Sequence, residues 1–154
     1  MDTSPLQRAT RADIPQLLEF IRGYHAFDHF DFDQENSRAA VESLVADEAL
    51  GRIWLIVENG VSVGYLCICF GYSLEFLGRD SFIDEFFLIE SARGHGLGTR
   101  ALRAAIAEIR AVGIRALHLE VERENENAQK LYRKLGFADR SRFFVMSKDL
   151  TTEP

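Results

Sequence analysis

The sequence lacks the features that define several large classes of protein. None of its apolar stretches reaches the roughly 20 residues that a membrane-spanning helix needs, and its first residues, MDTSPLQ, lack the basic-then-apolar pattern of a secretory signal peptide. No internal repeat and no Pro-rich or Ser-rich linker divides its 154 residues. We therefore expect a single domain spanning residues 1–154, located in the cytoplasm and without a membrane partner.

Cysteine and positive charge are both scarce. The only two cysteines, Cys67 and Cys69, are two residues apart, which places them on one face of a strand and does not match a CxxC redox or zinc pair. We interpret them as reduced thiols. Lysine and arginine number 18 against 24 acidic residues, a net charge of -6, whereas nucleic-acid-binding domains are normally basic. The composition disfavours a nucleic-acid partner and suits a cationic one.

Hydrophobic periodicity and turn residues predict alternating strands and helices. Asn59–Gly60, between two β-rich runs, is a strong signal for a two-residue hairpin. Strands are predicted at residues 6–10, 52–58, 61–70, 82–89, 114–122 and 140–150. Helices are predicted from residue 14 after a capping Asp13, at 37–50 with Ala40 on the apolar side, at 97–112 with Gly113 as its left-handed end, and at 128–135. This order indicates an α/β fold with a mixed sheet and a central β-loop-α-β unit.

The junction ARGHGLGTR, residues 92–100, places three glycines between a predicted strand and a predicted helix. Such a loop aims backbone N–H groups and the positive end of the helix dipole at one point, which favours an anion. Arg93, His95 and Arg100 add donors of the right charge. The alternative is a tight connection whose glycines only permit a positive φ. A Walker loop would need a GK[ST] ending, and a dinucleotide fingerprint would need glycine in place of Thr99, so a nucleotide-binding domain is disfavoured.

Two motifs in this chain resemble those of a known superfamily. Arg93, Gly96 and Gly98 match the [Q/R]-x-x-G-x-[G/A] signature of the GNAT superfamily of acyl-CoA-dependent N-acyltransferases. NENAQKLYRKLGF is similar to that superfamily's N-x-x-A-x-x-[LF]-Y-x-x-x-G-F segment. The resemblance implies a single-domain α/β fold, with a mixed, mostly antiparallel sheet flanked by helices. It also implies acetyl-CoA as co-substrate and a homodimer.

The resemblance also implies roles for individual residues. Amides of the glycine loop would wrap the pyrophosphate of acetyl-CoA, while the end of the preceding strand and Asn125 would contact its pantetheine arm. Tyr132 would protonate the departing thiolate, a role that suits a phenol, although a packed aromatic is the alternative. The residues expected to bind the co-substrate are Phe87, Leu88, Arg93, Gly94, His95, Gly96, Leu97, Gly98, Thr99 and Asn125.

The acceptor amine must lose a proton before it attacks, so we look for a base. Asp84 and Glu85 are adjacent in a predicted strand and are expected to point to opposite faces, which leaves open which one serves. Residues 71–98 further resemble the branch of the superfamily that acetylates polyamines and diamines, so a small cationic amine is the predicted acceptor. A protein amino group, an aminoglycoside and a non-catalytic acyl-CoA-binding role are the alternatives. His118 and Glu120, on a polar strand face, are weaker candidates.

His25 and His29 lie four residues apart, close to several aspartates. Such a pair can bind zinc on a helix, but the HEXXH pattern is absent and the predicted chemistry needs no metal, so we predict none. We interpret the pair as a surface helix end. In the superfamily this segment often covers the acceptor site, so its acidic side chains could attract a cationic amine.

Overall fold

The computed structural model describes residues 4–152, and the chain forms two compact units, residues 1–120 and 121–154. In unit 1 the strands are β1 (Leu6–Arg8), β2 (Gly51–Glu58), β3 (Val61–Ser73), β4 (Gly78–Leu88) and β5 (Ala116–His118). Its helices are α1 (Ile14–Phe27), α2 (Gln34–Ala46) and α3 (Leu97–Ala111), with short 3-10 turns at Arg11–Asp13 and Glu90–Ala92. Unit 2 holds α4 (Glu126–Lys134). Within the described part of the chain, no helix combines the length and the apolar character needed to cross a membrane.

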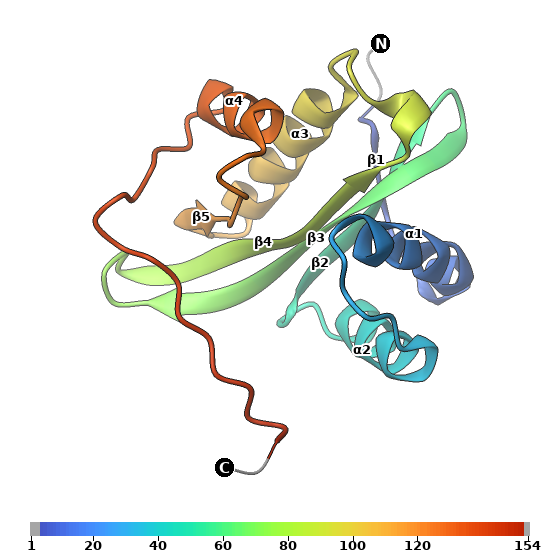
Figure 1. Cartoon of the computed structure of the whole chain (residues 1–154), viewed down its shortest axis with the longest axis horizontal. Coiled ribbons are helices and arrows are strands. Elements are labelled where there is room, and N and C mark those ends of the chain that lie inside the picture. Colours follow the sequence, from blue (N-terminus) through green and yellow to red (C-terminus); the bar gives the residue numbers. More distant parts are fainter. Residues whose placement is uncertain (1–3, 153–154) are drawn as a thin grey trace. The chain divides into compact units, whose positions relative to one another are not determined.

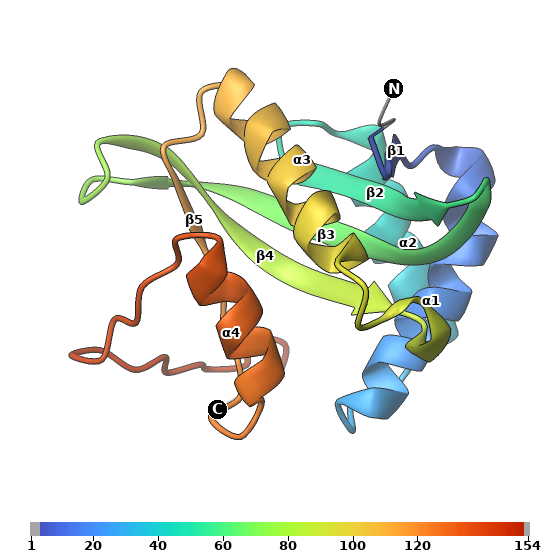
Figure 2. The same cartoon turned by 90° about the horizontal axis from the view of Figure 1, so that it is seen from above.

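The sheet is mixed and mostly antiparallel, as the resemblance implied. Its strands follow the order β1-β2-β3-β4-β5, and every neighbouring pair is antiparallel except β4 and β5. The parallel pair is joined through the glycine loop and α3, which forms the predicted β-loop-α-β unit (Figures 1 and 2). Asn59 and Gly60 both have positive φ, at 52° and 78°, as the predicted hairpin turn requires.

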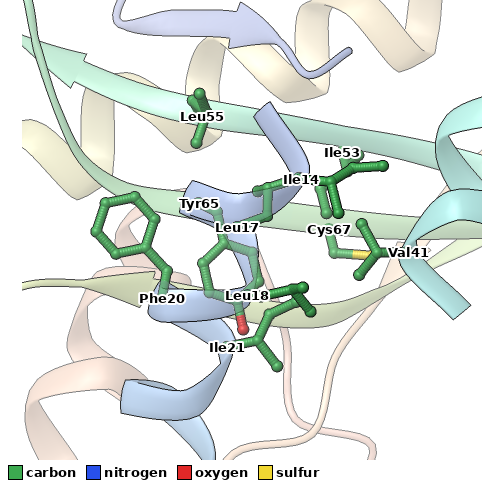
Figure 3. Packing of buried hydrophobic residues seen from close by; sticks show 10 residues of the cluster. All are labelled: Ile14, Leu17, Leu18, Phe20, Ile21, Val41, Ile53, Leu55, Tyr65 and Cys67. Atoms are coloured by element: carbon green, nitrogen blue, oxygen red, sulfur yellow. The ribbon is translucent and has the colours of Figure 1, made fainter. Parts of the chain in front are cut away.

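Helices α1 and α2 cover one face of the sheet, which we call the α1 face. Alternate strand residues Ile53, Leu55, Tyr65 and Cys67 point to it, because successive side chains of a strand point to opposite faces. They pack against one stripe of α1, with Val41 of α2 closing the cluster (Figure 3). The buried residues of that stripe are Ile14, Leu17, Leu18, Phe20 and Ile21. Each aliphatic side chain buried here stabilises the fold by about 1.5–3 kcal/mol.

Helix α3 covers the opposite face. Trp54 and Leu66, which alternate with residues of the α1 face, are fully buried there, and Trp54 Nε1 donates to Glu108 Oε2 of α3 at 3.1 Å. The buried residues of α3 are Leu97, Ala101, Leu102, Ala105 and Ile109. Gly113 follows with φ of 86°, the predicted left-handed end of the helix.

Three expectations about secondary structure are wrong. The strand predicted at residues 114–122 is limited to β5, Ala116–His118. The second helix ends at Ala46 and not near residue 50, because Asp47 leaves the helical conformation and its carboxylate accepts from the amide of Ala49. Its buried residue is Val41, whereas the expected Ala40 is exposed.

The predicted strand at residues 140–150 does not form. The chain there is irregular, and Phe143, Phe144 and Met146 are exposed by 60%, 78% and 84%. A strand needs a hydrogen-bonded partner, and the described part of unit 2 contains only a helix. An apolar segment alone was therefore not enough to form a strand.

Candidate active site

The glycine loop connects β4 to α3, and its glycines serve different purposes. Gly94 and Gly96 both have φ of 86°, and Gly96 is the residue that precedes the first turn of α3. A Cβ atom at either would meet no atom within 4 Å, so the backbone conformation, not packing, requires glycine. A Cβ atom on Gly98 would lie 3.2 Å from Phe86 Cζ, so this glycine allows the helix to approach β4. Gly96 offers no side chain that could cap the amides of the first turn.

The basic side chains around the loop already have partners. Arg93 Nε donates to the carbonyl oxygen of Leu88 at 2.8 Å, and its guanidinium lies 5.6 Å from the centre of the Phe87 ring. His95 Nε2 and Arg100 Nη2 lie 3.2 and 3.9 Å from Glu58 Oε1 at the end of β2. An anion bound here would therefore compete with Glu58 for two of the three cations.

Other loop residues offer the backbone only. The Leu97 side chain is buried in the core, so only its amide can face a ligand. Thr99 lies in the first turn of α3, where amides lack partners within the helix.

Asp84 and Glu85 lie on the same face of the sheet, and the expectation that they point to opposite faces is wrong. Cys67 pairs with Glu85 while the next residue, Ile68, pairs with Ile83, so Asp84 is the extra residue of a β-bulge. Carboxylate oxygens of Asp84 lie within 4.8 Å of the sulfurs of Cys67 and Cys69, and Glu85 contacts His25 of α1. The bulge interrupts the alternation and brings both carboxylates to the α1 face.

Glu85 is held by two hydrogen bonds. His25 Nε2 lies 2.7 Å from Glu85 Oε2, and the Tyr65 hydroxyl donates to Glu85 Oε1 at 3.0 Å. Both His25 and Glu85 are largely buried, with side chains 20% and 18% exposed. The rings of Phe30 and Phe32 stand edge-on to the imidazole, with centres 5.9 and 6.1 Å away.

Burial shapes the chemistry of these groups. Desolvation raises the pKa of Glu85, while the hydrogen bonds from His25 and Tyr65 lower it. Desolvation also raises the pKa of Asp84, although the residue as a whole is exposed, because its carboxylate lies beside the two thiols. Burial raises the pKa of the Tyr65 hydroxyl, and nearby Glu85 adds to this effect. In each of these phenol and carboxyl groups, burial disfavours the charged form relative to the same group in water.

The thiols of Cys67 and Cys69 lie next to each other. Cys67 donates to Cys69, which raises the pKa of Cys67 together with its burial and lowers the pKa of Cys69. Their sulfurs and Asp84 form a group of three possible metal ligands, which the CxC spacing alone did not predict. The prediction that the protein uses no metal stays a prediction.

Sequence reasoning missed the partners of His25. It placed His25 at a surface helix end with His29, but the structure brings only His25 to the carboxylates, while His29 is exposed. One signal was available. His25 follows Leu18 and Ile21 at helical spacing, so it continues the buried stripe of α1. Tyr65 gave no comparable signal.

The weaker candidates, His118 at the end of β5 and Glu120 beyond that strand, lie apart from this cluster. His118 Nε2 is 3.5 Å from Asp80 Oδ2, and its ring is 5.0 Å from that of Phe76. Glu120 is exposed. Among the described residues, neither side chain forms a hydrogen bond or an ion pair with Asp84 or Glu85.

Asn125 and Tyr132 belong to unit 2. Asn125 Oδ1 accepts from the amide of Ala128 at 3.1 Å and thereby caps α4. The ring of Tyr132 lies 5.7 Å from that of Phe137, and burial raises the pKa of its hydroxyl to about 12. Their predicted roles in binding and proton transfer stay predictions.

Comparisons with known proteins bear on the family of this chain. The model of the acetyltransferase (GNAT) family matches residues 15–137. The uncharacterized N-acetyltransferase YycN of Bacillus subtilis is 42% identical over 72 residues, which are 47% of this chain and 45% of that protein. The uncharacterized N-acetyltransferase MJ1207 of Methanocaldococcus jannaschii is 28% identical over 141 residues, which are 90% of this chain and 62% of that protein. The chain thus spans about half to three fifths of these relatives.

The fold also matches solved structures. An integron cassette protein from the mobile metagenome of Cole Harbour Salt Marsh superimposes with a TM-score of 0.85 and 30% identity. The match covers 97% of this chain and 92% of that one.

Proposed function

The chain belongs to the acetyltransferase (GNAT) family, and from this premise we propose that it transfers an acetyl group from acetyl-CoA to a primary amine. We propose a small cationic amine, such as a diamine or polyamine, as the acceptor. The observation that carries the choice of acceptor is the bulge in β4, which gathers the carboxylates of Asp84 and Glu85 on one face. Two adjacent carboxylates attract a cation more strongly than one.

The glycine loop supports the binding of acetyl-CoA. Amides of residues 93–99 and the positive end of the α3 dipole suit the pyrophosphate. Pairing with β5 covers only Asp80–Phe82 of β4, so the edge of β4 near Phe87 and Leu88 has no strand partner among residues 4–152. Backbone groups at such an edge can hydrogen-bond the amides of a pantetheine arm.

The proposed reaction is a direct transfer. The ammonium group of the acceptor gives one proton to Glu85, and the neutral nitrogen then attacks the thioester carbon. The carbon–sulfur bond breaks and the thiolate leaves with a proton from Tyr132, while the second proton of the nitrogen passes through water to the Tyr132 oxygen and restores the phenol. Glu85 then releases its proton to solvent. The Tyr132 hydroxyl, with its pKa of about 12, stays protonated at neutral pH and so can act as the acid. The homodimer and the cytoplasmic location stay predictions.

A panel of amines tests this proposal. With acetyl-CoA as donor, release of free thiol should be fastest with diamines and polyamines, because both carboxylates favour a multiply charged acceptor. Faster release with an aminoglycoside or a peptide amino group would overturn the choice of acceptor. Tight binding of acetyl-CoA without thiol release on any amine would show a non-catalytic binding protein. Calorimetric titration with acetyl-CoA, ATP and NAD supplies the binding measurement.

A further inference from the structure

We propose that Cys67, Cys69 and Asp84 form a binding site for a soft divalent metal ion, such as Zn²⁺ or Cd²⁺, and that an ion bound there blocks the acceptor side of the active site. All three residues belong to unit 1, so the metal site itself depends on that unit alone. The blocking effect rests on the proposed function, because it concerns the acceptor of that reaction. The ion takes no part in the transfer of the acetyl group.

The three ligands meet because of the strand pairing around the bulge. Cys67 and Cys69 are two residues apart on β3 and share its α1 face. Asp84, the extra residue of the bulge in β4, is brought to the same face. The two sulfurs and a carboxylate oxygen of Asp84 all lie within 4.8 Å of one another. Three donor atoms from two neighbouring strands therefore converge on one point.

The spacing of these atoms suits a tetrahedral ion after a small adjustment. Zn²⁺ binds thiolate sulfur at about 2.3 Å and carboxylate oxygen at about 2.0–2.2 Å, so the donor atoms of a tetrahedral site are about 3.5–3.8 Å apart. Because the donors here lie within 4.8 Å of one another, side-chain rotation has to close a gap of about 1 Å. Both cysteines lie on β3, which pairs with β2 and β4, so the backbone that carries the thiols is fixed before the ion binds.

The chemistry of the ligands selects a soft ion. Thiolate sulfur prefers Zn²⁺ and softer ions, whereas Mg²⁺ and Ca²⁺ prefer sets of oxygen ligands. Each thiol that binds the ion releases its proton to solvent. Two thiolates and one carboxylate then carry three negative charges, which more than balance a divalent ion.

The Asp84 carboxylate gains a partner when a cation binds. Desolvation beside the thiols is the main influence on this group, and no hydrogen bond from residues 4–152 offsets it. Glu85, by contrast, is already held by His25 and Tyr65. A desolvated carboxylate without a hydrogen-bond donor is therefore the side chain of this pair that is ready to bind an ion.

An ion can reach the site from the surface. Cys67 is buried in the core of the α1 face (Figure 3), Cys69 is half-buried and Asp84 is exposed. The ligands thus lead from the surface toward the core, and an ion entering on the Asp84 side meets the carboxylate first. Three protein ligands leave the fourth position of a tetrahedral ion open to water or to an amine.

A bound ion would interfere with the proposed acceptor. Asp84 is one of the two carboxylates proposed to attract the cationic amine, and a metal ion would occupy it. The ion would also place positive charge where the amine should bind. We therefore expect the ion and the amine to compete.

Titration of the reduced, chelator-treated protein with Cd²⁺ tests binding without turnover. The ultraviolet charge-transfer absorption of cadmium–thiolate bonds should increase until one ion is bound per chain. Excess Zn²⁺ should displace Cd²⁺, whereas excess Mg²⁺ should not. A thiol assay before each titration shows that neither cysteine has been oxidised. Lack of this absorption in protein with both thiols reduced would overturn the proposal.

Variants test the individual ligands. Cys69→Ser and Cys67→Ala should each weaken Cd²⁺ binding about 100-fold or more, since loss even of a residue that only supports a ligand costs about 10–100-fold. Asp84→Asn should weaken it about tenfold or more and keep the thiolate absorption. Asp31→Asn, at an exposed position, is the matched control and should bind as the wild type does. If Cys67→Ala does not fold, the half-buried Cys69→Ser still supplies the test. Unchanged affinity in a folded cysteine variant or in Asp84→Asn would overturn the three-ligand site.

Initial rates with a diamine test the blocking effect, with the acetylated amine measured by chromatography. Zn²⁺ at about ten times its Kd should raise KM for the amine about tenfold and leave kcat unchanged, and a chelator should reverse this. Cys69→Ser should keep the wild-type rate without metal and show no such rise. Equal inhibition of Cys69→Ser would overturn the blocking effect. Lack of turnover with every amine, together with Cd²⁺ binding, would count against the proposed function alone.

Discussion

At the scale of single residues, partial burial of the Asp84 and Glu85 carboxyl groups on the α1 face costs desolvation free energy. Glu85 recovers some of that cost through two hydrogen bonds, whereas Asp84 lies beside two thiols, and desolvation raises the pKa of both carboxyl groups. A group whose pKa is raised by folding binds its proton more tightly in the folded state. Asp84 therefore favours the folded state in acid and loses that contribution as the pH rises past its folded-state pKa.

Asp84→Asn should consequently stabilise the protein at neutral pH. The amide removes the charge that folding must desolvate, so the melting temperature at about pH 7 should increase, and the gain should shrink as the pH falls toward about 4. Thermal unfolding at several pH values measures this. Asp31→Asn, at an exposed position, is the control and should change little. A melting temperature that is lower or unchanged at neutral pH would contradict the prediction.

Tyr132→Phe tests the proposed acid. The ring and its packing against Phe137 are retained, so affinity for acetyl-CoA should change little, while kcat should fall about 100-fold. Because the pKa of Tyr132 is about 12, the wild-type rate should show no alkaline decline before the pH approaches that value. Steady-state kinetics and calorimetry measure both quantities, with the exposed Tyr72→Phe as control. Wild-type turnover in Tyr132→Phe would leave Tyr132 as a packed aromatic only.

At the scale of elements, the predictions that depended on local backbone chemistry were confirmed. Asn59 and Gly60 form the hairpin and Gly113 ends α3, because a positive φ is a property of a residue and its neighbours. The shared face of Asp84 and Glu85 could not be predicted in this way. It results from a one-residue shift in the pairing of β3 and β4, which no local pattern encodes. The failed strand at 140–150 has a similar cause, since strand formation depends on a partner elsewhere in the chain.

Two glycines with the same φ stand at the two ends of α3, Gly96 in the glycine loop and Gly113 after the helix. Gly96→Val and Gly113→Val both force a branched side chain into φ of 86°, and neither Cβ atom would meet another atom within 4 Å. Both should lose stability through the same backbone strain, about 1–3 kcal/mol. Only Gly96→Val should also weaken acetyl-CoA binding, by about tenfold or more, because its side chain would crowd the diphosphate.

Chemical unfolding and calorimetric titration with acetyl-CoA distinguish strain from binding in these variants. Gly113→Val reports the strain alone, and its affinity for acetyl-CoA should equal that of the wild type. Equal affinities in both folded variants would remove Gly96 from the binding site.

At the scale of the whole molecule, the proposed acceptor is a cation and the proposed donor, acetyl-CoA, is an anion. Acidic side chains would meet the acceptor, and basic side chains would meet the donor. The chain has a net charge of -6, and its two adjacent site carboxylates lie on the α1 face. The basic side chains around the glycine loop lie at the connection between β4 and α3, where His95 and Arg100 interact with Glu58. Composition predicted a cationic partner, whereas the contact of His25 with Glu85 joins α1 to β4 and could not be located from either segment alone.

Added salt should therefore weaken the binding of a cationic acceptor. Screening shortens the range of the field from about 30 Å at 0.01 M salt to about 8 Å at 0.15 M, so the attraction of the whole acidic surface for a distant cation is lost. We expect KM for a diamine to rise several-fold between these salt concentrations, and KM for a monoamine of the same length to rise less, because it carries one charge fewer. Initial rates at saturating acetyl-CoA measure both, with sucrose at matched osmolarity in place of salt as the control. Equal salt dependence for the two amines would contradict an acceptor site built on two carboxylates.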